Sequence, residues 1–235
     1  MEIVFNDFDK TYDLLKDKLS WDYIDPLKFK VKTLEQYFGG IYLDVTGKQK
    51  CDYVEDKLKP PSFVCYFYYF IFLFKRVSTQ QEYIGFYYSV NSFWIFKNVG
   101  SKYDEAFKGR LDRFYPSMLR DIHFYHLLKE SQLFQMVLFV LEYDLNSKID
   151  VFVKREEQWY GIQLRTKTYR SQKYYNKKPN RNMVKLNARL IDIPINLRSA
   201  NSIPTRGDKF KIYSKVHIDR IINEITYFER NGDIS

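Results

Sequence analysis

The stretch that most limits the fold is residues 148–166, KIDVFVKREEQWYGIQLRT. Two runs of β-branched and aromatic residues flank an acidic Glu-Glu dipeptide, a pattern typical of an antiparallel hairpin. With this dipeptide as the turn, Asp150 faces Gln163 across the two strands. Strand side chains alternate between faces, so Gln163, Arg165 and Lys167 share one side of the second strand. A register slip of one residue would separate these polar groups.

Polar groups inside apolar strands need a partner or a function, because burying them alone is costly. Opposed side chains lie about 5 Å apart at Cβ. That separation allows the carboxylate of Asp150 and the amide oxygen of Gln163 to bind one divalent cation. The alternative is a solvated cross-strand pair with no chemical role.

Further elements surround the hairpin. Residues 101–131 have the pattern of a helix, with a break or kink expected near Pro116. Runs at 135–144 and 189–197 are strand-like, and 217–230 form an amphipathic helical pattern. The order helix, three strands, basic segment, strand, helix predicts an α+β fold with a mixed sheet flanked by helices.

The N-terminal part is unusually aromatic, in a chain with 21 Tyr and 20 Phe. Three apolar runs separated by turn-like residues predict a β-meander over about residues 63–98. We therefore expect an aromatic β-rich region at 1–100 and a separate core at 101–235. The aromatic sheet would pack internally, or contact a protein partner or a second copy in a homodimer.

The residues of the hairpin resemble a known family. Asp150 followed by GIQLR is similar to the signature of the PD-(D/E)XK, or restriction-endonuclease-like, nuclease superfamily. There an acid interrupts one strand, and an acid-x-Lys or Gln-x-Lys triplet lies on the next. The stretch DLNSKIDVFV also resembles the approach to the metal-binding aspartate. The resemblance covers roughly residues 101–200 and implies an αβββαβ core.

This resemblance implies a nuclease that cleaves DNA phosphodiester bonds with Mg²⁺ or Mn²⁺. Asp150 and Gln163 would bind the metal, with the main-chain carbonyl of Leu164. Arg165 and Lys167 would bind or polarise the scissile phosphate, although arginine stands where the family has lysine and cannot act as a base.

The family often adds a glutamate from the preceding helix. Glu130 is preferred narrowly over Glu105 as the residue that completes the metal site, with Asp121 and Glu142 behind them. Glu130 shares a helical face with His123 and His126, whose three-residue spacing is typical of packing rather than zinc binding.

Residues 158–191 contain no acid and nine cations, which equals the net charge of +9 of the whole chain. Localised positive charge interleaved with tyrosine favours binding to a nucleic-acid backbone, DNA more than RNA by the resemblance. A solvated loop or a site for an acidic protein surface is the alternative. The predicted contact residues are Arg170, Lys173, Tyr174, Lys177, Lys178 and Arg181.

The N-terminus has no secretory pattern, and the longest apolar run, 63–74, is shorter than a bilayer span. Cys51 and Cys65 lack metal-ligand spacing. These features predict a soluble, cytoplasmic protein. A catalytically inactive nucleic-acid-binding module and a structural or interaction subunit are the alternatives to a nuclease.

Overall fold

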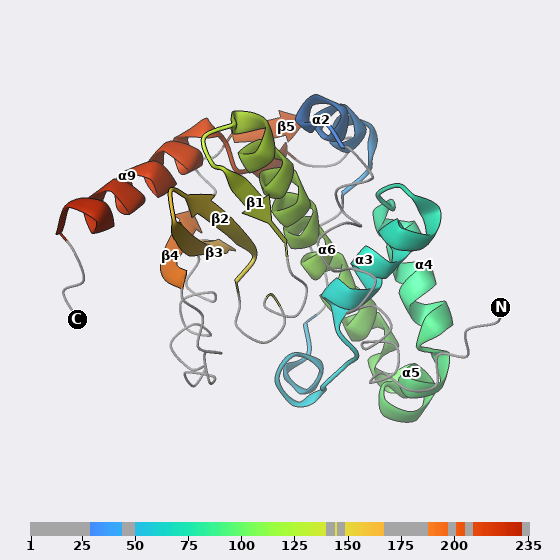
Figure 1. Cartoon of the computed structure of the whole chain (residues 1–235). Helices are drawn as coiled ribbons and strands as arrows, with labels where there is room; N and C mark the ends of the chain where they lie inside the picture. The colour runs from blue at the N-terminus through green and yellow to red at the C-terminus, as the bar shows by residue number, and fades with distance from the viewer. Residues whose placement is uncertain are drawn as a thin grey trace. The chain divides into compact units, whose positions relative to one another are not determined.

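The computed structural model describes residues 29–43, 50–139, 144, 149–166, 188–196, 201–204 and 209–231 (Figure 1). Their helices and strands follow in chain order: α2 (Val31–Gly40), η1 (Tyr53–Lys57), α3 (Phe63–Phe74), α4 (Gln80–Val90), α5 (Ser92–Asn98), α6 (Gly100–Ser131), β1 (Met136–Leu138), β2 (Val151–Arg155), β3 (Gln158–Thr166), β4 (Ala188–Ile195), β5 (Asn201–Pro204), β6 (Lys209–Ile212) and α9 (Lys215–Asn231).

The chain divides into two compact units that are each discontinuous in sequence. Unit 1 contains residues 1–28, 36–119 and 204–210, and unit 2 contains 29–35, 120–203 and 211–235. Residue 100, where the sequence suggested a division, lies inside unit 1. The helix α6 is continuous through Pro116, and its residues up to Leu119 belong to unit 1.

The aromatic region of unit 1 is helical, so the predicted β-meander at 63–98 is wrong. Helices α3, α4 and α5 occupy this range. The Ser62 side chain accepts a hydrogen bond from the Cys65 amide and caps α3. A short apolar run cannot be assigned to strand or helix by periodicity alone, and the aromatic residues of α3 are buried on nearly every side. Tertiary burial therefore overrides their β-propensity.

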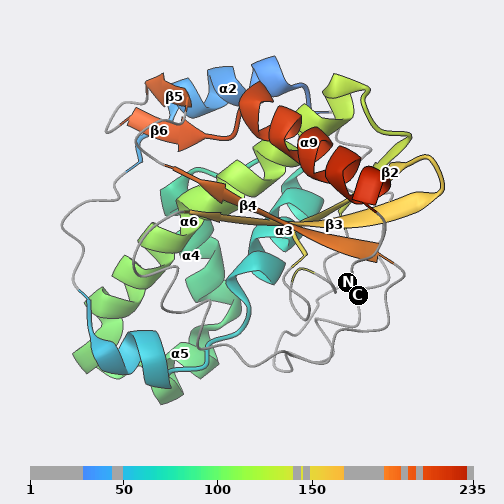
Figure 2. The ribbon, with the colours of Figure 1, turned by 90° about the vertical axis from the view of Figure 1, so that its left-hand side faces the viewer.

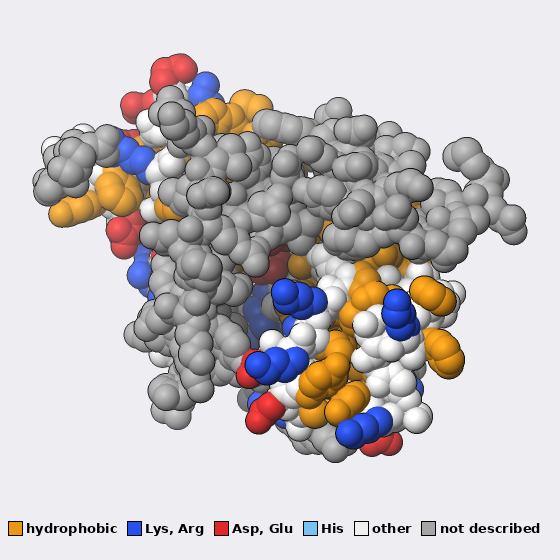
Figure 3. All heavy atoms as spheres, turned by 90° about the horizontal axis from the view of Figure 1, so that it is seen from below, with side chains coloured by type: hydrophobic (Ala, Val, Ile, Leu, Met, Phe, Trp, Pro, Cys, Tyr) orange, Lys and Arg blue, Asp and Glu red, His pale blue; other side chains and the backbone are white. Residues whose placement is uncertain are grey.

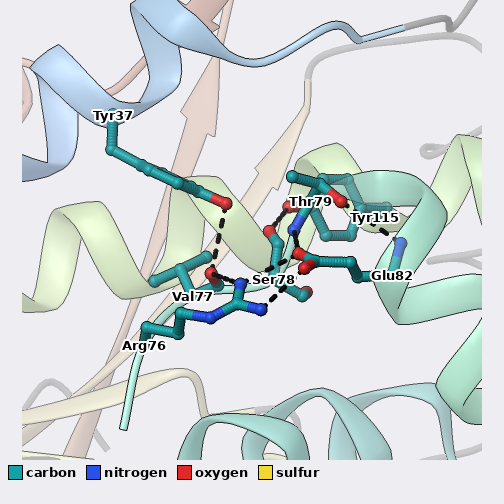
Figure 4. Close-up of polar contacts among 7 residues, drawn as sticks. All are labelled: Tyr37, Arg76, Val77, Ser78, Thr79, Glu82 and Tyr115. Carbon is teal, nitrogen blue, oxygen red and sulfur yellow. Dashed lines mark hydrogen bonds and ion pairs between the residues drawn. The ribbon is translucent and has the colours of Figure 1, made fainter. Parts of the chain in front are cut away.

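A network of polar contacts holds the turn between α3 and α4 (Figure 4). The guanidinium of Arg76 donates two hydrogen bonds to the carboxylate of Glu82, at 2.6 and 2.9 Å. Glu82 and Thr79 form a reciprocal capping box at the start of α4. The hydrogen bonds from Arg76 lower the pKa of Glu82 to about 2. Tyr37 and Tyr115 donate hydroxyl hydrogen bonds to main-chain carbonyl groups of this turn.

Unit 2 contains a mixed four-stranded sheet with strand order β1-β2-β3-β4, which confirms the α+β class. Strands β1, β2 and β3 pair antiparallel, and β4 pairs parallel with β3. The predicted hairpin register is confirmed, because Val151 is paired with Ile162 and Arg155 with Gln158. Glu156 makes the turn with a φ of +52°. Primed hairpin turns need a positive φ at their first central position, and this residue adopts it without glycine.

The helix α9 packs against one face of this sheet (Figure 2). Its residues Ile218, Ile221 and Ile225 recur at helical spacing and are buried. Arg189 of β4 donates a hydrogen bond to the main-chain carbonyl of Phe228 at 3.3 Å, which fixes the outer end of α9. The amphipathic pattern therefore predicted both the helix and its buried side.

Gly161 sits where β3 has no room for a side chain. A Cβ at this position would lie 3.0 Å from Leu190 Cδ2 and 3.1 Å from Ile149 Cδ1. We expect Gly161→Ala to lower the free energy of unfolding by about 1–2 kcal/mol through overpacking. Gly85→Ala is the control, because nothing lies within 4 Å of its Cβ position on α4 and alanine favours helix. Urea denaturation of both variants measures the difference, and equal effects would contradict this account of Gly161.

His123 and His126 are buried in the second half of α6. The Nε2 of His126 has no hydrogen-bond partner among the described residues. Burial, with a contribution from His123, lowers the pKa of His126 to about 4. The unfolded chain therefore binds a proton more readily than the folded chain between about pH 6.5 and pH 4, and stability is lost as pH falls through this window.

We expect His126→Leu to reduce this pH dependence. Between about pH 7 and pH 5, wild type should lose about 2 kcal/mol more unfolding free energy than the variant. Urea denaturation at the two pH values measures the difference. An identical loss in both proteins would show that His126 is not the group responsible.

Among the described residues, none of the helices has both the length and the apolar character needed to cross a membrane.

Candidate functional site

The site in unit 2 begins at Asp150, directly before β2. Its amide donates to the carbonyl of Ile162 at 3.0 Å, and its carboxylate Oδ2 accepts from the amide of Leu164 at 2.5 Å. The side chain thus takes the hydrogen bond that a main-chain carbonyl would take in a longer ladder. The paired residues of the hairpin end at Val151 and Ile162, directly beside Asp150. The polar break in the first strand is therefore the place where the ladder of β2 with β3 starts.

Two further carboxyl groups interact with Asp150. The Asp144 carboxyl shares a hydrogen bond with it, and Asp121 of α6 interacts with it electrostatically. Burial, reinforced by the negative charges of the other two groups, raises the pKa of Asp150 well above the usual carboxyl range. Burial also raises the pKa of Asp121 and of Asp144. A hydrogen bond between two carboxyl groups requires a proton, because two adjacent carboxylates repel each other.

Tyr213 connects this acidic cluster to the packing of unit 2. Its ring stacks in a tilted arrangement on Phe124, with centroids 4.7 Å apart. Burial raises the pKa of its hydroxyl, and the charges of Asp121 and Asp150 raise it further. The hydroxyl therefore remains protonated and can donate a hydrogen bond beside the acids.

Arg165 forms an ion pair with Asp192 on β4. Its Nε lies 2.8 and 2.7 Å from the two carboxylate oxygens, and its Nη2 lies 2.6 Å from Oδ2. Gln163 is paired with Asp192 in the parallel register, and Arg165 lies two residues after Gln163 on the same strand face. The side chains of Arg165 and Asp192 therefore lie on the same face of the sheet. The guanidinium that was predicted to bind the scissile phosphate is thus already bound to a carboxylate.

The described part of the site carries more negative than positive charge when all its groups are ionised. The four acids are Asp121, Asp144, Asp150 and Asp192, and the two cations are Arg120 and Arg165. Two carboxylates remain unbalanced, which equals the charge of one divalent cation. Burial is the main cause of the raised pKa values, and protons can neutralise these carboxylates where no cation does.

The donors suit a hard cation such as Mg²⁺ or Mn²⁺, which prefers carboxylate and carbonyl oxygens. Within the described ranges, no three His, Cys, Asp or Glu side chains converge closely enough to hold one metal ion. Mg²⁺ commonly takes only one or two protein carboxylates and completes its shell with water and phosphate. The hydrogen-bonded pair of Asp144 and Asp150 meets that smaller requirement.

The structure does not bring Glu130 to this site. Its Oε1 accepts a hydrogen bond from the Val31 amide at 2.7 Å, at the start of α2, where helix amides lack partners. Glu130 lies nine residues from Asp121 on the same helix, about 13 Å along its axis. Glu105 is exposed in unit 1. The helix acid beside Asp150 is Asp121, which sequence reasoning ranked lower.

Several predicted residues lie outside the described part of the chain. These are Glu142, Lys167, Arg170, Lys173, Tyr174, Lys177, Lys178 and Arg181. Gln163 and Arg165 are described and half-buried.

Asp144 and Asp192 were not among the predicted site residues. Asp192 breaks the apolar run RLIDIPI in the way that Asp150 breaks its own strand, so the same signal was present. Asp144 lies six residues before Asp150 and belongs to no described strand. The contact between the two carboxyl groups therefore depends on the tertiary fold.

Comparison of the chain with protein-family models, with curated proteins and with solved structures finds no significant match.

Proposed function

We propose that unit 2 is a divalent-metal-dependent nuclease that hydrolyses phosphodiester bonds in DNA. The observation that carries the proposal is the group of three buried, interacting carboxyl groups, Asp121, Asp144 and Asp150, at the start of the β2–β3 hairpin. Its uncompensated negative charge suits a dication. The acid-free basic segment that follows β3 in sequence suits the phosphate backbone.

The order of elements also supports a restriction-endonuclease-like core. Three antiparallel strands follow α6, and the basic segment leads to β4, which pairs parallel with β3. Among the described elements, the first helix, the three strands and the parallel strand agree with the αβββαβ order that the resemblance implies. Asp150 directly before β2 and Gln163 on β3 are the residues that the resemblance compares with the family's signature.

In this proposal Asp144 and Asp150 would hold the cation, with the amide oxygen of Gln163 as a further donor. A divalent cation held there would supply polarisation of the phosphoryl oxygen and a lower pKa for a water molecule. Asp121 accepts the proton of the attacking water, because a raised pKa brings a carboxylate close to the range of an efficient general base. The Leu164 amide holds the Asp150 carboxylate in place.

Arg165 has a positioning role in this proposal, because Asp192 holds it. The ion pair joins β3 to β4 at the register position of Gln163. Contact with the scissile phosphate then belongs to Lys167 and the basic segment, with Arg170, Lys173, Lys177, Lys178 and Arg181 along the backbone.

Incubation with plasmid DNA and Mn²⁺ tests the proposal. We expect nicked and linear products that require the cation and disappear with EDTA. Binding to DNA in the presence of EDTA should weaken steeply with salt, because several phosphate contacts release counterions. Binding without cleavage under any divalent cation would contradict the proposed activity.

The Arg165–Asp192 pair favours a second candidate function. Family members use a lysine at this position, and a guanidinium bound to a carboxylate cannot replace it in proton transfer. A catalytically inactive, nucleic-acid-binding relative would retain the salt-dependent binding and show no cleavage with Mg²⁺ or Mn²⁺.

A further inference from the structure

Helix α5 in unit 1 presents two aromatic rings to solvent. Phe93 is 70% exposed and Phe96 is 82% exposed. The same helix buries Ile95, and Asn91 and Val99 before and after it are also buried. The helix is thus anchored through one side, and the two rings lie on the other. Large apolar side chains at such exposure cost solvation free energy, so a neighbouring pair indicates an interaction surface.

The rings are positioned as neighbours by the helix itself. Residues three and four apart on a helix lie side by side, about 5–6 Å apart at Cβ. Phe93, Phe96 and Lys97 have this spacing, and all three are exposed. The surface therefore combines two ring faces with one ammonium group at its edge.

The charge along this part of the sequence favours an anionic partner. From Tyr83 to Tyr103 the sequence contains no Asp or Glu, and it contains Lys97 and Lys102. The Lys102 ammonium lies 5.0 Å from the ring centroid of Tyr103. Figure 3 shows a face of the molecule on which hydrophobic side chains lie among Lys and Arg side chains.

A third exposed ring, that of Tyr53, stacks on the last residue of the same acid-free segment. Tyr53 is 43% exposed and stacks on Tyr103 with centroids 4.7 Å apart. Arg110 donates to the carbonyl of Leu58 at 3.3 Å and also to the carbonyl of Val54, which holds the segment that carries Tyr53. A ring with one face supported by another ring offers its remaining area to a planar ligand.

We propose that Phe93 and Phe96, with Lys97 at their edge, form a stacking surface for the unpaired bases of single-stranded nucleic acid. Aromatic rings beside cations are the chemistry by which proteins bind single strands without sequence preference, since every base has a π-face. The surface offers aromatic rings and no exposed aliphatic side chain, and α5 is only seven residues long. An interfacial membrane helix has a polar face rich in Lys and Arg, whereas α5 contains a single cation, Lys97.

This inference rests on the proposed function only for the class of ligand, and its test is independent of catalysis. Binding of a fluorescent oligothymidylate of about 15 nucleotides is measured by anisotropy in EDTA, at fixed ionic strength. We expect the double variant Phe93→Ala/Phe96→Ala to bind about 10- to 100-fold more weakly than wild type. Phe93→Trp/Phe96→Trp should retain the affinity.

Tyr42→Ala is the matched control, because Tyr42 is also largely exposed but lies outside this segment. It should bind like wild type. Circular dichroism verifies that each variant is folded. Equal affinity of the folded Phe93→Ala/Phe96→Ala variant and wild type would overturn the proposal.

Two further outcomes would assign the surface to another partner and would also overturn it. One is loss of sedimentation with phosphatidylserine vesicles in the double alanine variant without any loss of oligothymidylate binding. The other is a dimer, measured by light scattering, that depends on the two rings while oligothymidylate binding does not.

Discussion

Asp150→Asn is expected to abolish metal-dependent DNA cleavage, with a rate at least about 1,000-fold below wild type. Asparagine retains an oxygen that can accept the hydrogen bond from the Leu164 amide, so the local structure should persist. It removes the negative charge and breaks the proton-sharing contact with Asp144. A loss of this size corresponds to about 4 kcal/mol of transition-state stabilisation, within the several kcal/mol that a bound cation supplies.

Glu157→Gln provides the matched control for this change. It makes the same kind of substitution on the same hairpin, but Glu157 is exposed at the turn. We expect it to cleave at the wild-type rate, measured as the conversion of supercoiled to nicked plasmid with Mn²⁺. Cleavage by Asp150→Asn at the rate of Glu157→Gln would remove Asp150 from the active site.

Divalent cations should stabilise the folded chain, and more strongly at high pH than at low pH. Burial raises the pKa of Asp144 to about 7 and that of Asp121 to about 8. Both values exceed the unfolded value near 4, so the folded chain holds protons that the unfolded chain releases. Their contribution to stability is thus present at low pH and is lost as pH rises from about 4 to about 8.

A cation replaces those protons at high pH. With Mn²⁺ at about 100 times its dissociation constant, we expect about 2.7 kcal/mol of stabilisation at about pH 8, which is a rise in Tm of roughly 5–10 °C. The rise should shrink at about pH 5.5, where protons compete with the cation. Differential scanning fluorimetry with and without Mn²⁺ measures both values.

Asp150→Asn should differ from wild type both in its stability without metal and in its response to Mn²⁺. Without metal at about pH 8 it should be more stable than wild type by about 1–2 kcal/mol, because one of the repelling charges is gone. Its Tm should not respond to Mn²⁺. A Tm rise in the variant equal to that of wild type would show that the cation binds elsewhere.

The hairpin could be predicted from the sequence to the level of single residue pairs. A two-residue turn at Glu156 and Glu157 leaves only one register for the strands that flank it, although consecutive residues of β2 are buried. Val151 opposite Ile162 follows directly from this register. The amphipathic pattern of α9 was equally informative, because the spacing of Ile218, Ile221 and Ile225 allows only one buried side.

The aromatic region could not be assigned correctly in the same way. In α3 the side chains from Cys65 to Ile71 are all buried, so the sequence has no polar face from which a helical period can be read. The distinguishing signals were at the helix starts. Ser62 before α3 and Thr79 three residues before Glu82 are capping residues, which strands do not need.

The sequence reasoning identified a residue of the candidate site only within the hairpin. Asp150 was identified because it interrupts a strand, but its partners come from distant positions. Asp121 is on a helix and Asp144 lies in the connection before β2. Which helix acid faces the sheet depends on the rotation of α6, and the role of Glu130 at the start of α2 is a tertiary contact that no local pattern reports.

The most direct test of the account is calorimetric titration of the protein with Mn²⁺ at about pH 7, in buffers of different ionisation enthalpy. The central claim is that Asp144 and Asp150 share a proton that a divalent cation displaces. It predicts saturable binding with release of about one proton per bound ion, and loss of both in Asp150→Asn. Binding without proton release, or unchanged binding in Asp150→Asn, would contradict it.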